Sequence, residues 1–500
     1  MKTHFDVLIA GAGISGIAAA YYLQKNFPTK SFAIVEARDG IGGTWDLFRY
    51  PGIRSDSDMY TFGYSFYPWR QPQAMAPAPA ILEYLNGAVD EFGIRHKIRF
   101  GIRVERLSFS TAKSQWTVHA RDVNTGKSQE YTCNFLWACM GYYRYEAGYT
   151  PEFEGVERFR GPIVHPQQWT DDIYYDGKRV VVIGSGATAV TLVPALAERA
   201  AHVTMLQRSP SYIVSIPQND PIDRALKWLV GERRAYRLIR WKYIFLTTMF
   251  YRFARRYPDL AKRFYVAGVR KALQPSYDVE KHFNPSYYPW DQRLCMVPDG
   301  DLFEAINQGK MSVVTDEIDS FTERGIALKS GENLDADLIV TATGITLQLF
   351  GGAKLEVDGE VVDPAQSVGY KGAMLSGVPN FAFTIGYVNA SWTLRAEITS
   401  QYVCDVLRVM DEKGCTLCCP RVDPGVELDT PVDLSSGYFQ RSLNILPKRG
   451  KEFPWRAAQN YKIDRRAMLE GAIEDGVLEF TQADAADQRH VSARQQVVAP

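Results

Sequence analysis

Two glycine-rich turns, each preceded by an apolar run and followed by a helical pattern, constrain the fold of this chain more than any other feature. The first follows residues 5–10 and the second follows residues 179–183. In this strand–turn–helix order, glycines let the backbone approach a pyrophosphate, which the N-terminus of the helix then binds. The turns read G-x-G-x-x-G and G-x-G-x-x-A, at Gly11, Gly13 and Gly16 and at Gly184, Gly186 and Ala189. The sequence therefore predicts an α/β protein with two Rossmann-type dinucleotide-binding domains.

The residue that ends the second strand of each unit differs between the two turns. Glu36 follows the apolar run 32–35, where a carboxylate can bind ribose hydroxyls and would repel a 2′-phosphate. At the matching place of the second unit stand Arg208 and Ser209. An arginine fork binds phosphate bidentately and stays charged at working pH. The first site therefore suits FAD or NAD, and the second is predicted to bind NADPH, with Arg208 and Ser209 on the 2′-phosphate.

Residues 42–56 continue the first nucleotide site. Gly42 and Gly43 are followed by Thr44 and Trp45, and a glycine pair in this register is typical of a flavin site rather than an NAD site. No cysteine precedes Cys133, which excludes a flavin disulfide reductase because that class needs a Cys-x-x-x-x-Cys pair early in the chain. Asp56 has two interpretations from the residues alone: a helix cap in the polar run 55–58, or a functional carboxylate.

A bridge of the form Phe-x-Gly-x-x-x-His-x-x-x-Trp stands between the two turns. It consists of Phe159, Gly161, His165 and Trp169. In one interpretation His165 is a hydrogen-bonded histidine between domains and Trp169 is a packing residue. The bridge, together with the Gly-Gly-x-Trp, Tyr-Pro-Gly and Asp run at 42–56, resembles the two signatures of the type I Baeyer–Villiger flavin monooxygenases. The similarity extends over residues 6–461 and is strongest to the ethionamide-activating branch of that family.

The resemblance implies roles for several residues. Arg293 matches the catalytic arginine of the family, and Asp56 matches the aspartate that pairs with it. Gln292 stands where the family has a lysine that helps to hold NADPH, so this chain departs from the family at that contact. Asn389 and Trp392 match the turn beside the flavin. The bridge is thought to couple domain motion to cofactor handling, so His165 is not expected to act as a catalytic base.

The resemblance also implies a reaction. NADPH would reduce FAD, and a C4a-peroxyflavin formed with O2 would insert one oxygen atom into a ketone to give an ester or lactone. Sulfides and thioamides are further expected substrates. Two alternatives remain at this point: a flavin N- or S-monooxygenase and an uncoupled NADPH oxidase. Arg293 with Asp56 argues against a third, a flavin-bound redox sensor without turnover, because a binding module needs neither residue.

Five hundred residues exceed the size of one hydrophobic core, so several subdomains are expected. The predicted division places the FAD-binding domain at 1–145 and 336–480, where the second range also holds the C-terminal region. The NADPH-binding domain is placed at 146–220 and 291–335, with a helical insertion at 221–290. The Ala-, Gln- and Asp-rich tail 481–500 is expected to be disordered.

Charge and cysteine content limit the partners. The formal net charge of zero argues against nucleic acid, although the insertion is basic and aromatic. An anionic-membrane contact through that insertion is the second interpretation, after a helical wall of a substrate pocket. Seven cysteines predict reduced thiols in the cytoplasm, and no metal site is expected from Cys415, Cys418 and Cys419 because structural zinc needs four ligands.

Overall fold

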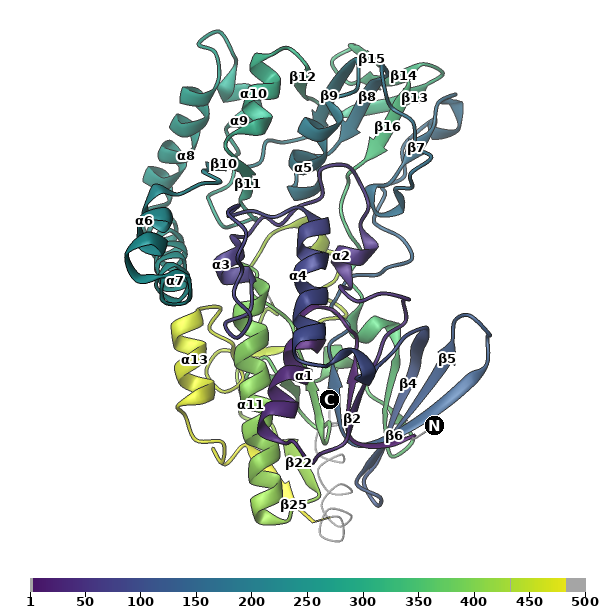
Figure 1. Ribbon diagram of the computed structural model, residues 1–500. Helices are drawn as coiled ribbons and strands as arrows, with labels where there is room; N and C mark the ends of the chain where they lie inside the picture. The colour runs from purple at the N-terminus through teal and green to yellow at the C-terminus, as the bar shows by residue number, and fades with distance from the viewer. Residues whose placement is uncertain (1–2, 432, 483–500) are drawn as a thin grey trace.

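The computed structural model describes residues 3–431 and 433–482, and its two main sheets lie one above the other (Figure 1). The predicted disordered tail falls almost entirely outside the described residues. The first sheet has the strand order β18-β17-β4-β5-β6-β1-β2-β3, with β21 added beside β6. Its strands are β1 (His4–Ala10), β2 (Phe32–Val35), β3 (Ile98–Arg99), β4 (Ile102–Ser110), β5 (Gln115–Asp122), β6 (Ser128–Ala138), β17 (Lys354–Val357), β18 (Glu360–Val361) and β21 (Phe381–Phe383).

The parallel part of the first sheet is built from apolar runs. β1 pairs in parallel with β2 on one side and β6 on the other, and its last four residues are buried. A parallel strand covered on both faces has no solvent side, so a continuous apolar run is the sequence that fits it. The carboxyl end of β1 leads into the first glycine turn, which places that turn at the edge of the sheet where nucleotides bind in open α/β folds.

The second sheet is parallel throughout and has the order β12-β9-β8-β16-β7. Its strands are β7 (Ile163–Val164), β8 (Arg179–Ile183), β9 (His202–Gln207), β12 (Met311–Thr315) and β16 (Leu338–Thr341). The predicted fold class, α/β with two dinucleotide-type units, is confirmed. One strand differs from expectation: β16, which the sequence places at the return to the first unit, pairs with β7 and β8 in the second sheet. The chain therefore rejoins the first sheet only after Thr341, not at residue 336.

Smaller sheets complete the strand content. They pair β10 (Ile213–Ile216) with β11 (Cys295–Pro298), β13 (Ile318–Thr322) with β14 (Gly325–Leu328) and β15 (Asn333–Asp335), β19 (Gly369–Tyr370) with β20 (Met374–Leu375), β22 (Leu417–Pro420) with β25 (Leu478–Thr481), and β23 (Leu428–Asp429) with β24 (Arg449–Gly450).

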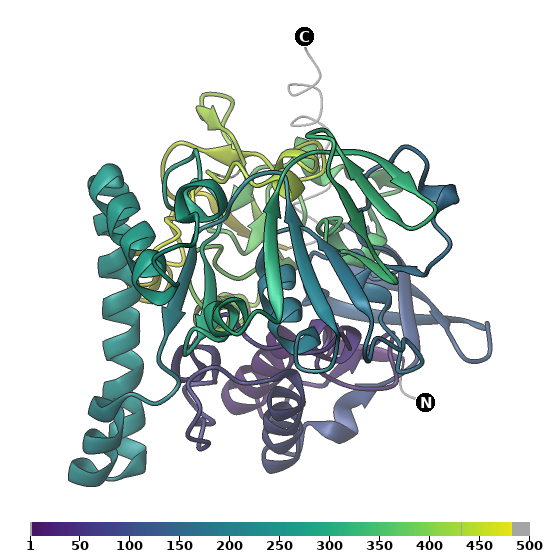
Figure 2. The same ribbon diagram turned by 90° about the horizontal axis from the view of Figure 1, so that it is seen from above.

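Some helices cover the two sheets, and others form the predicted insertion. Four of them, α6 to α9, lie between β10 and β11 in the chain, and α6, α7 and α8 stand along one side of the molecule (Figures 1 and 2). The helical insertion is confirmed. The helices are α1 (Ile14–Asn26), α2 (Thr44–Leu47), α3 (Met59–Phe62), α4 (Ala78–Glu91), α5 (Ala187–Leu196), α6 (Pro221–Val230), α7 (Glu232–Arg256), α8 (Pro258–Ala272), α9 (Val279–Phe283), α10 (Asp301–Asn307), α11 (Trp392–Lys413), α12 (Gly437–Gln440) and α13 (Tyr461–Leu469).

Candidate active site

The first glycine turn is packed so closely that side chains are excluded from it. A Cβ on Gly11, whose φ is +103°, would lie 2.5 Å from the carbonyl oxygen of Cys139, and one on Gly16 would lie 1.9 Å from the carbonyl oxygen of Gly11. Gly13 precedes α1 and provides no side-chain cap for its first N–H groups. Those N–H groups, with the positive end of the helix dipole, suit an anion such as a pyrophosphate.

A second glycine faces the first turn. A Cβ built on Gly13 would meet the Cα of Gly43 at 3.8 Å, so backbone faces backbone here with no side chain between. Gly43 has φ +56° and precedes α2, which begins with Thr44 and Trp45. The Trp45 ring packs edge-on against Phe62 at 5.5 Å. The turn and α2 together form a cradle that fits the dinucleotide part of a flavin.

Glu36 lies beside this cradle. Its carboxylate accepts hydrogen bonds from the backbone N–H of Ala12 at 2.7 Å and of Arg38 at 3.0 Å. Burial raises the pKa of the Glu36 carboxyl, while the two N–H donors act in the opposite direction. A buried carboxylate at the end of β2 suits ribose hydroxyls and disfavours a 2′-phosphate.

Asp56 and Arg293 come together although 237 residues separate them in the chain. Nη2 of Arg293 donates to Oδ2 of Asp56 at 3.0 Å, and the two side chains are 35% and 33% exposed. Asp56 raises the pKa of the Arg293 guanidinium, which therefore stays charged. The residue of the acidic run that caps a helix is Asp58 and not Asp56. The Asp58 carboxylate accepts a hydrogen bond from the Thr61 N–H at 2.8 Å at the start of α3.

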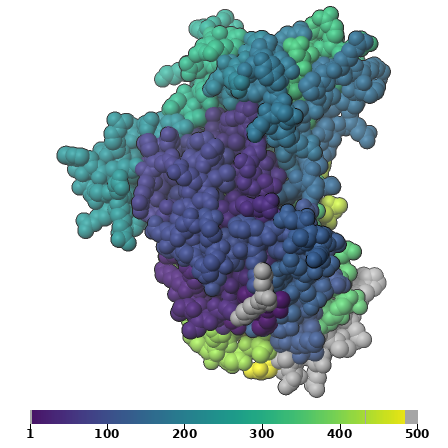
Figure 3. Space-filling view, turned by 45° about the vertical axis from the view of Figure 1, so that its right-hand side comes forward, coloured from purple at the N-terminus to yellow at the C-terminus, as the bar shows by residue number. Residues whose placement is uncertain are grey.

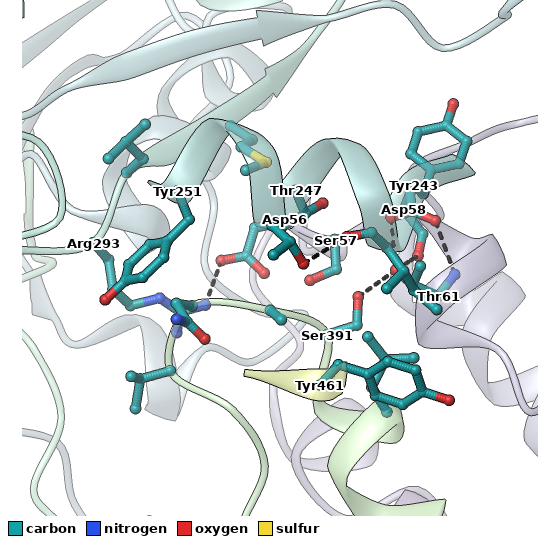
Figure 4. A pocket seen from close by; sticks show the side chains of 18 of the residues that line it. Asp56, Ser57, Asp58, Thr61, Tyr243, Thr247, Tyr251, Arg293, Ser391 and Tyr461 are labelled. Carbon is teal, nitrogen blue, oxygen red and sulfur yellow. Dashed lines mark hydrogen bonds and ion pairs between the residues drawn. The ribbon is translucent and has the colours of Figure 1, made fainter. Parts of the chain in front are cut away.

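The Asp56–Arg293 pair lines a cavity of about 120 Å³ between the loop before α3, helix α7 and the turn before α11 (Figure 4). Asn389 also lines it. The amide Nδ2 of Asn389 donates to the carbonyl of Gln459 at 3.0 Å, whereas its buried Oδ1 has no hydrogen-bond partner among the described residues. An unpaired buried acceptor is costly, so a ligand with an N–H donor fits this place.

Two predicted cofactor residues lie near the cavity without lining it. Nε1 of Trp392 donates to Oγ of Ser15 at 2.8 Å, and its ring stacks on Tyr142 with 5.3 Å between ring centroids. This contact joins the start of α11 to α1. Gln292 directly precedes Arg293 in the chain and is half-buried. Its backbone forms an isolated β-bridge with Pro289.

The second glycine turn repeats the geometry of the first. A Cβ on Gly184, whose φ is +133°, would lie 2.3 Å from the carbonyl oxygen of Ala342. Gly186 caps α5 without a side chain and has open space at its Cβ position, and Ala189 is buried in that helix. Arg208 and Ser209 directly follow β9 and are exposed. The second glycine turn thus has an exposed arginine at the end of the next strand.

The aromatic residues of the bridge pack against the second sheet. Phe159 and Trp169 are buried in different apolar clusters, and a Cβ on Gly161 would lie 2.7 Å from the Phe159 ring. Nε2 of His165 donates to the Gly344 carbonyl at 3.0 Å, and Nδ1 accepts from the Gln167 N–H at 3.1 Å. Burial lowers the pKa of His165, so the ring is neutral and both nitrogens are used.

Comparison with known proteins identifies the family. Residues 6–351 match the flavin-binding monooxygenase-like family. The chain belongs to this family. It is 51% identical over 487 residues to the FAD-containing monooxygenase EthA of Mycobacterium tuberculosis, covering 97% of this chain and 99% of that protein. It is 47% identical to the probable FAD-binding monooxygenase AlmA of Acinetobacter baylyi, covering 96% and 97%.

Solved structures of two monooxygenases have the same fold. An oxidized steroid monooxygenase bound to NADP superposes with a TM-score of 0.76 at 25% identity, covering 96% of this chain and 100% of that one. An open structure of cyclohexanone monooxygenase superposes with a TM-score of 0.75 at 21% identity, again covering 96% of this chain and 100% of that one. The predicted family resemblance is confirmed.

Sequence reasoning missed some residues around the arginine of this flavin monooxygenase. Tyr142, Tyr143 and Tyr438 lie close enough to Arg293 to contribute to its raised pKa. Tyr243 and Tyr251 of α7 line the cavity. Tyrosines at these positions are compatible with ordinary packing, and only the fold shows that Tyr142, Tyr143 and Tyr438 lie around one guanidinium.

The described residues offer neither a metal site nor a membrane-spanning helix. Among residues 3–431 and 433–482, no group of three or more His, Cys, Asp or Glu side chains is arranged to hold a metal ion. Cys418 and Cys419 are buried in β22, and Cys415 is partly exposed. No helix in that same part of the chain is both long and apolar enough to cross a membrane.

Proposed function

We propose that this flavin monooxygenase uses FAD, NADPH and O2 to convert ketones into esters or lactones, and that it also oxidises sulfides and thioamides. The observation that carries the proposal is the Asp56–Arg293 pair in a largely apolar cavity next to the flavin cradle. The steroid and cyclohexanone monooxygenases of the same fold support a carbonyl substrate.

The overall reaction balances without another co-reactant. A ketone, O2, NADPH and one proton give an ester, NADP⁺ and water. One carbon–carbon bond of the ketone breaks, and two carbon–oxygen bonds to the inserted oxygen atom form in the product. The two electrons of NADPH reduce the second oxygen atom to water.

The residues present fit an FAD molecule in the first unit. Four features match groups of that cofactor. They are the closely packed glycine backbone, the uncapped N-terminus of α1, the buried carboxylate of Glu36 and the unpaired amide oxygen of Asn389. Bound FAD would take hydride from NADPH and activate O2, chemistry that no amino-acid side chain supplies. The residues that we assign to it are Gly11, Gly13, Gly16, Glu36, Gly43, Thr44, Trp45, Asp56, Asn389 and Trp392.

The proposed role of Arg293 is to stabilise negative charge that develops on the substrate. Attack on a ketone places negative charge on the carbonyl oxygen, and a guanidinium lining the cavity stabilises that charge. One preorganised donor of this kind contributes about 3–4 kcal/mol to the transition state. Asp56 holds the guanidinium in place through their 3.0 Å ion pair and is a positioning residue in this proposal.

We assign the second unit to NADPH, held by Gly184, Gly186, Ala189, Arg208, Ser209 and Gln292. His165 is satisfied on both ring nitrogens by backbone groups. This supports a linking role for the four bridge residues rather than proton transfer.

Arg208→Ala tests the NADPH assignment. Losing a charged hydrogen-bond donor costs about 1.5–3 kcal/mol, so kcat/KM for NADPH should fall about 10- to 100-fold. The value for NADH, which lacks the 2′-phosphate, should hardly change. Anaerobic flavin reduction at varied NADPH and NADH measures both, with Arg233→Ala on the exposed side of α7 as the matched control. An equal fall for both nucleotides would contradict the assignment.

Purified holoprotein tests the reaction itself. We expect a flavin absorption spectrum, NADPH consumption that depends on O2 and ketone, and an ester that carries one labelled atom from ¹⁸O₂. Oxidation of amines or sulfides without any ester would favour an N- or S-monooxygenase. Stoichiometric hydrogen peroxide without product would indicate an uncoupled NADPH oxidase.

We further propose a cytoplasmic location, with weak peripheral contact between the helical insertion and the inner face of a membrane. Seven unpaired cysteines support the reducing compartment, and the basic insertion supports the membrane contact. The division of the chain into FAD and NADPH domains is likewise a proposal, with the boundary after β16 favoured by strand pairing.

A further inference from the structure

Helix α7 carries an apolar stripe on the side that faces away from the protein. Side chains three to four residues apart share one face of a helix, and this face is exposed along its whole length. The apolar residues in its centre are 42–54% exposed. The stripe consists of Leu238, Trp241, Phe245 and Met249 in the centre, with Arg234 at one end and Arg252 and Arg256 at the other.

The neighbouring helices extend this apolar surface. Among the described residues, 12 of the 21 exposed large apolar side chains lie within residues 221–272. Trp228, at the end of α6, is 85% exposed, and Phe264 of α8 is 61% exposed. In the space-filling view the insertion projects from the side of the molecule, where it is accessible (Figure 3). Such a concentration marks an interaction surface rather than the scattered apolar residues of an ordinary protein surface.

The same segment is strongly basic. Residues 221–272 contain 14 Lys or Arg and 3 Asp or Glu, in a chain whose formal charge is zero. A second copy of this surface would meet it with the same charge, which disfavours self-association. Exposed Trp, Phe and Leu interleaved with arginine suit the headgroup region of an anionic lipid bilayer.

The opposite face of α7 lines the cavity that holds the Asp56–Arg293 pair. The lining residues of this helix are Tyr243, Ile244, Thr247, Thr248 and Tyr251. One helix, about 10 Å across, therefore separates the exposed apolar stripe from the reaction cavity.

A buried clamp holds α7 in this position. Arg240 lies on the inward face, and its Nη1 donates to the carbonyls of Tyr60 at 2.7 Å and Gly63 at 2.6 Å. Its Nη2 pairs with Glu397 of α11 at 2.5 Å. Contact between the insertion and another surface would thus occur at a fixed place relative to the cavity.

We propose that α6, α7 and α8 rest on an anionic phospholipid bilayer and that the cavity takes its substrate from the lipid phase. The substrate class is a lipophilic ketone or sulfide with a long apolar chain, which partitions into the bilayer that α7 contacts. This inference rests on the proposed function for the reaction, but the lipid contact is a property of the surface alone.

The experiment compares the FAD-loaded enzyme with L238S/F245S/M249S, which removes the centre of the stripe without touching a cavity-lining residue. V361S/L428S is the matched control, because both residues are exposed apolar side chains outside the insertion. Sedimentation with phosphatidylglycerol vesicles and with phosphatidylcholine vesicles measures binding. Turnover is followed with dodecyl methyl ketone dissolved in the vesicles and with butanone in the buffer.

We expect the unmodified enzyme and the control to bind phosphatidylglycerol vesicles, and the triple variant to bind more than about tenfold more weakly. Turnover of the vesicle-dissolved ketone should fall by a similar factor, while butanone turnover stays unchanged. Equal vesicle binding of all three proteins, or none, would overturn the proposal. So would a dimer in sedimentation velocity that only the triple variant loses, because a second copy would then cover the stripe. Absence of turnover on both ketones would refute the proposed reaction and leave the vesicle result readable.

Discussion

Arg293→Ala is expected to lower the rate of ester formation about 100- to 1000-fold while bound FAD is still reduced by NADPH. Hydride transfer between the cofactors needs no cation at the substrate carbonyl, whereas the attacked carbonyl oxygen gains a negative charge that the guanidinium stabilises. Anaerobic bleaching of the flavin by NADPH measures the first step. Chromatography of the ester and assay of hydrogen peroxide measure the second.

Two further variants separate charge from position. Arg255→Ala removes another arginine, one that pairs with Asp291 at 2.8 Å on the surface, and should leave product formation unchanged. Asp56→Asn keeps the size of the side chain but loses the ion pair, so ester yield should fall less than in Arg293→Ala. A normal ester yield from Arg293→Ala would remove the basis of the proposed mechanism.

Glu397→Ala should destabilise the protein by about 3–5 kcal/mol, the largest stability effect that we expect from a single change. Glu397 and Arg240 are 6% and 7% exposed, and the substitution leaves the buried guanidinium without its counter-charge. The Ser65 N–H, which donates to Glu397 at 2.8 Å, also loses its acceptor. Chemical unfolding followed by tryptophan fluorescence measures the loss.

An exposed ion pair provides the control for this prediction. Lys413 and Glu474 are 43% and 55% exposed, so Glu474→Ala should cost no more than about 1 kcal/mol. The double variant R240M/E397L should be more stable than Glu397→Ala, because replacing both partners leaves no unpaired buried charge. Equal stability of Glu397→Ala and Glu474→Ala would show that the clamp does not hold α7 to the core.

The nucleotide-binding units and the family could be predicted from the amino-acid sequence alone. The signals that predict them are local in the sequence: a glycine turn, the strand before it, and the carboxylate or arginine that ends the next strand. Each of these features is typical of one kind of nucleotide-binding structure. Glu36 beside the first turn and Arg208 after β9 lie where those local rules place them. The helical insertion was also predictable, because its periodicity differs from that of the flanking strands.

The pairing of side chains that are distant in the chain became evident from the fold. The acidic run before α3 offers several candidate carboxylates, and the fold assigns Asp56 to Arg293 and Asp58 to the helix cap. It also moves β16 into the second sheet. The sequence of α7 does not show which of its faces lines the cavity and which is exposed, because that depends on the elements that pack against the helix. Pairing and burial depend on neighbours far along the chain, and local residue patterns do not encode those neighbours.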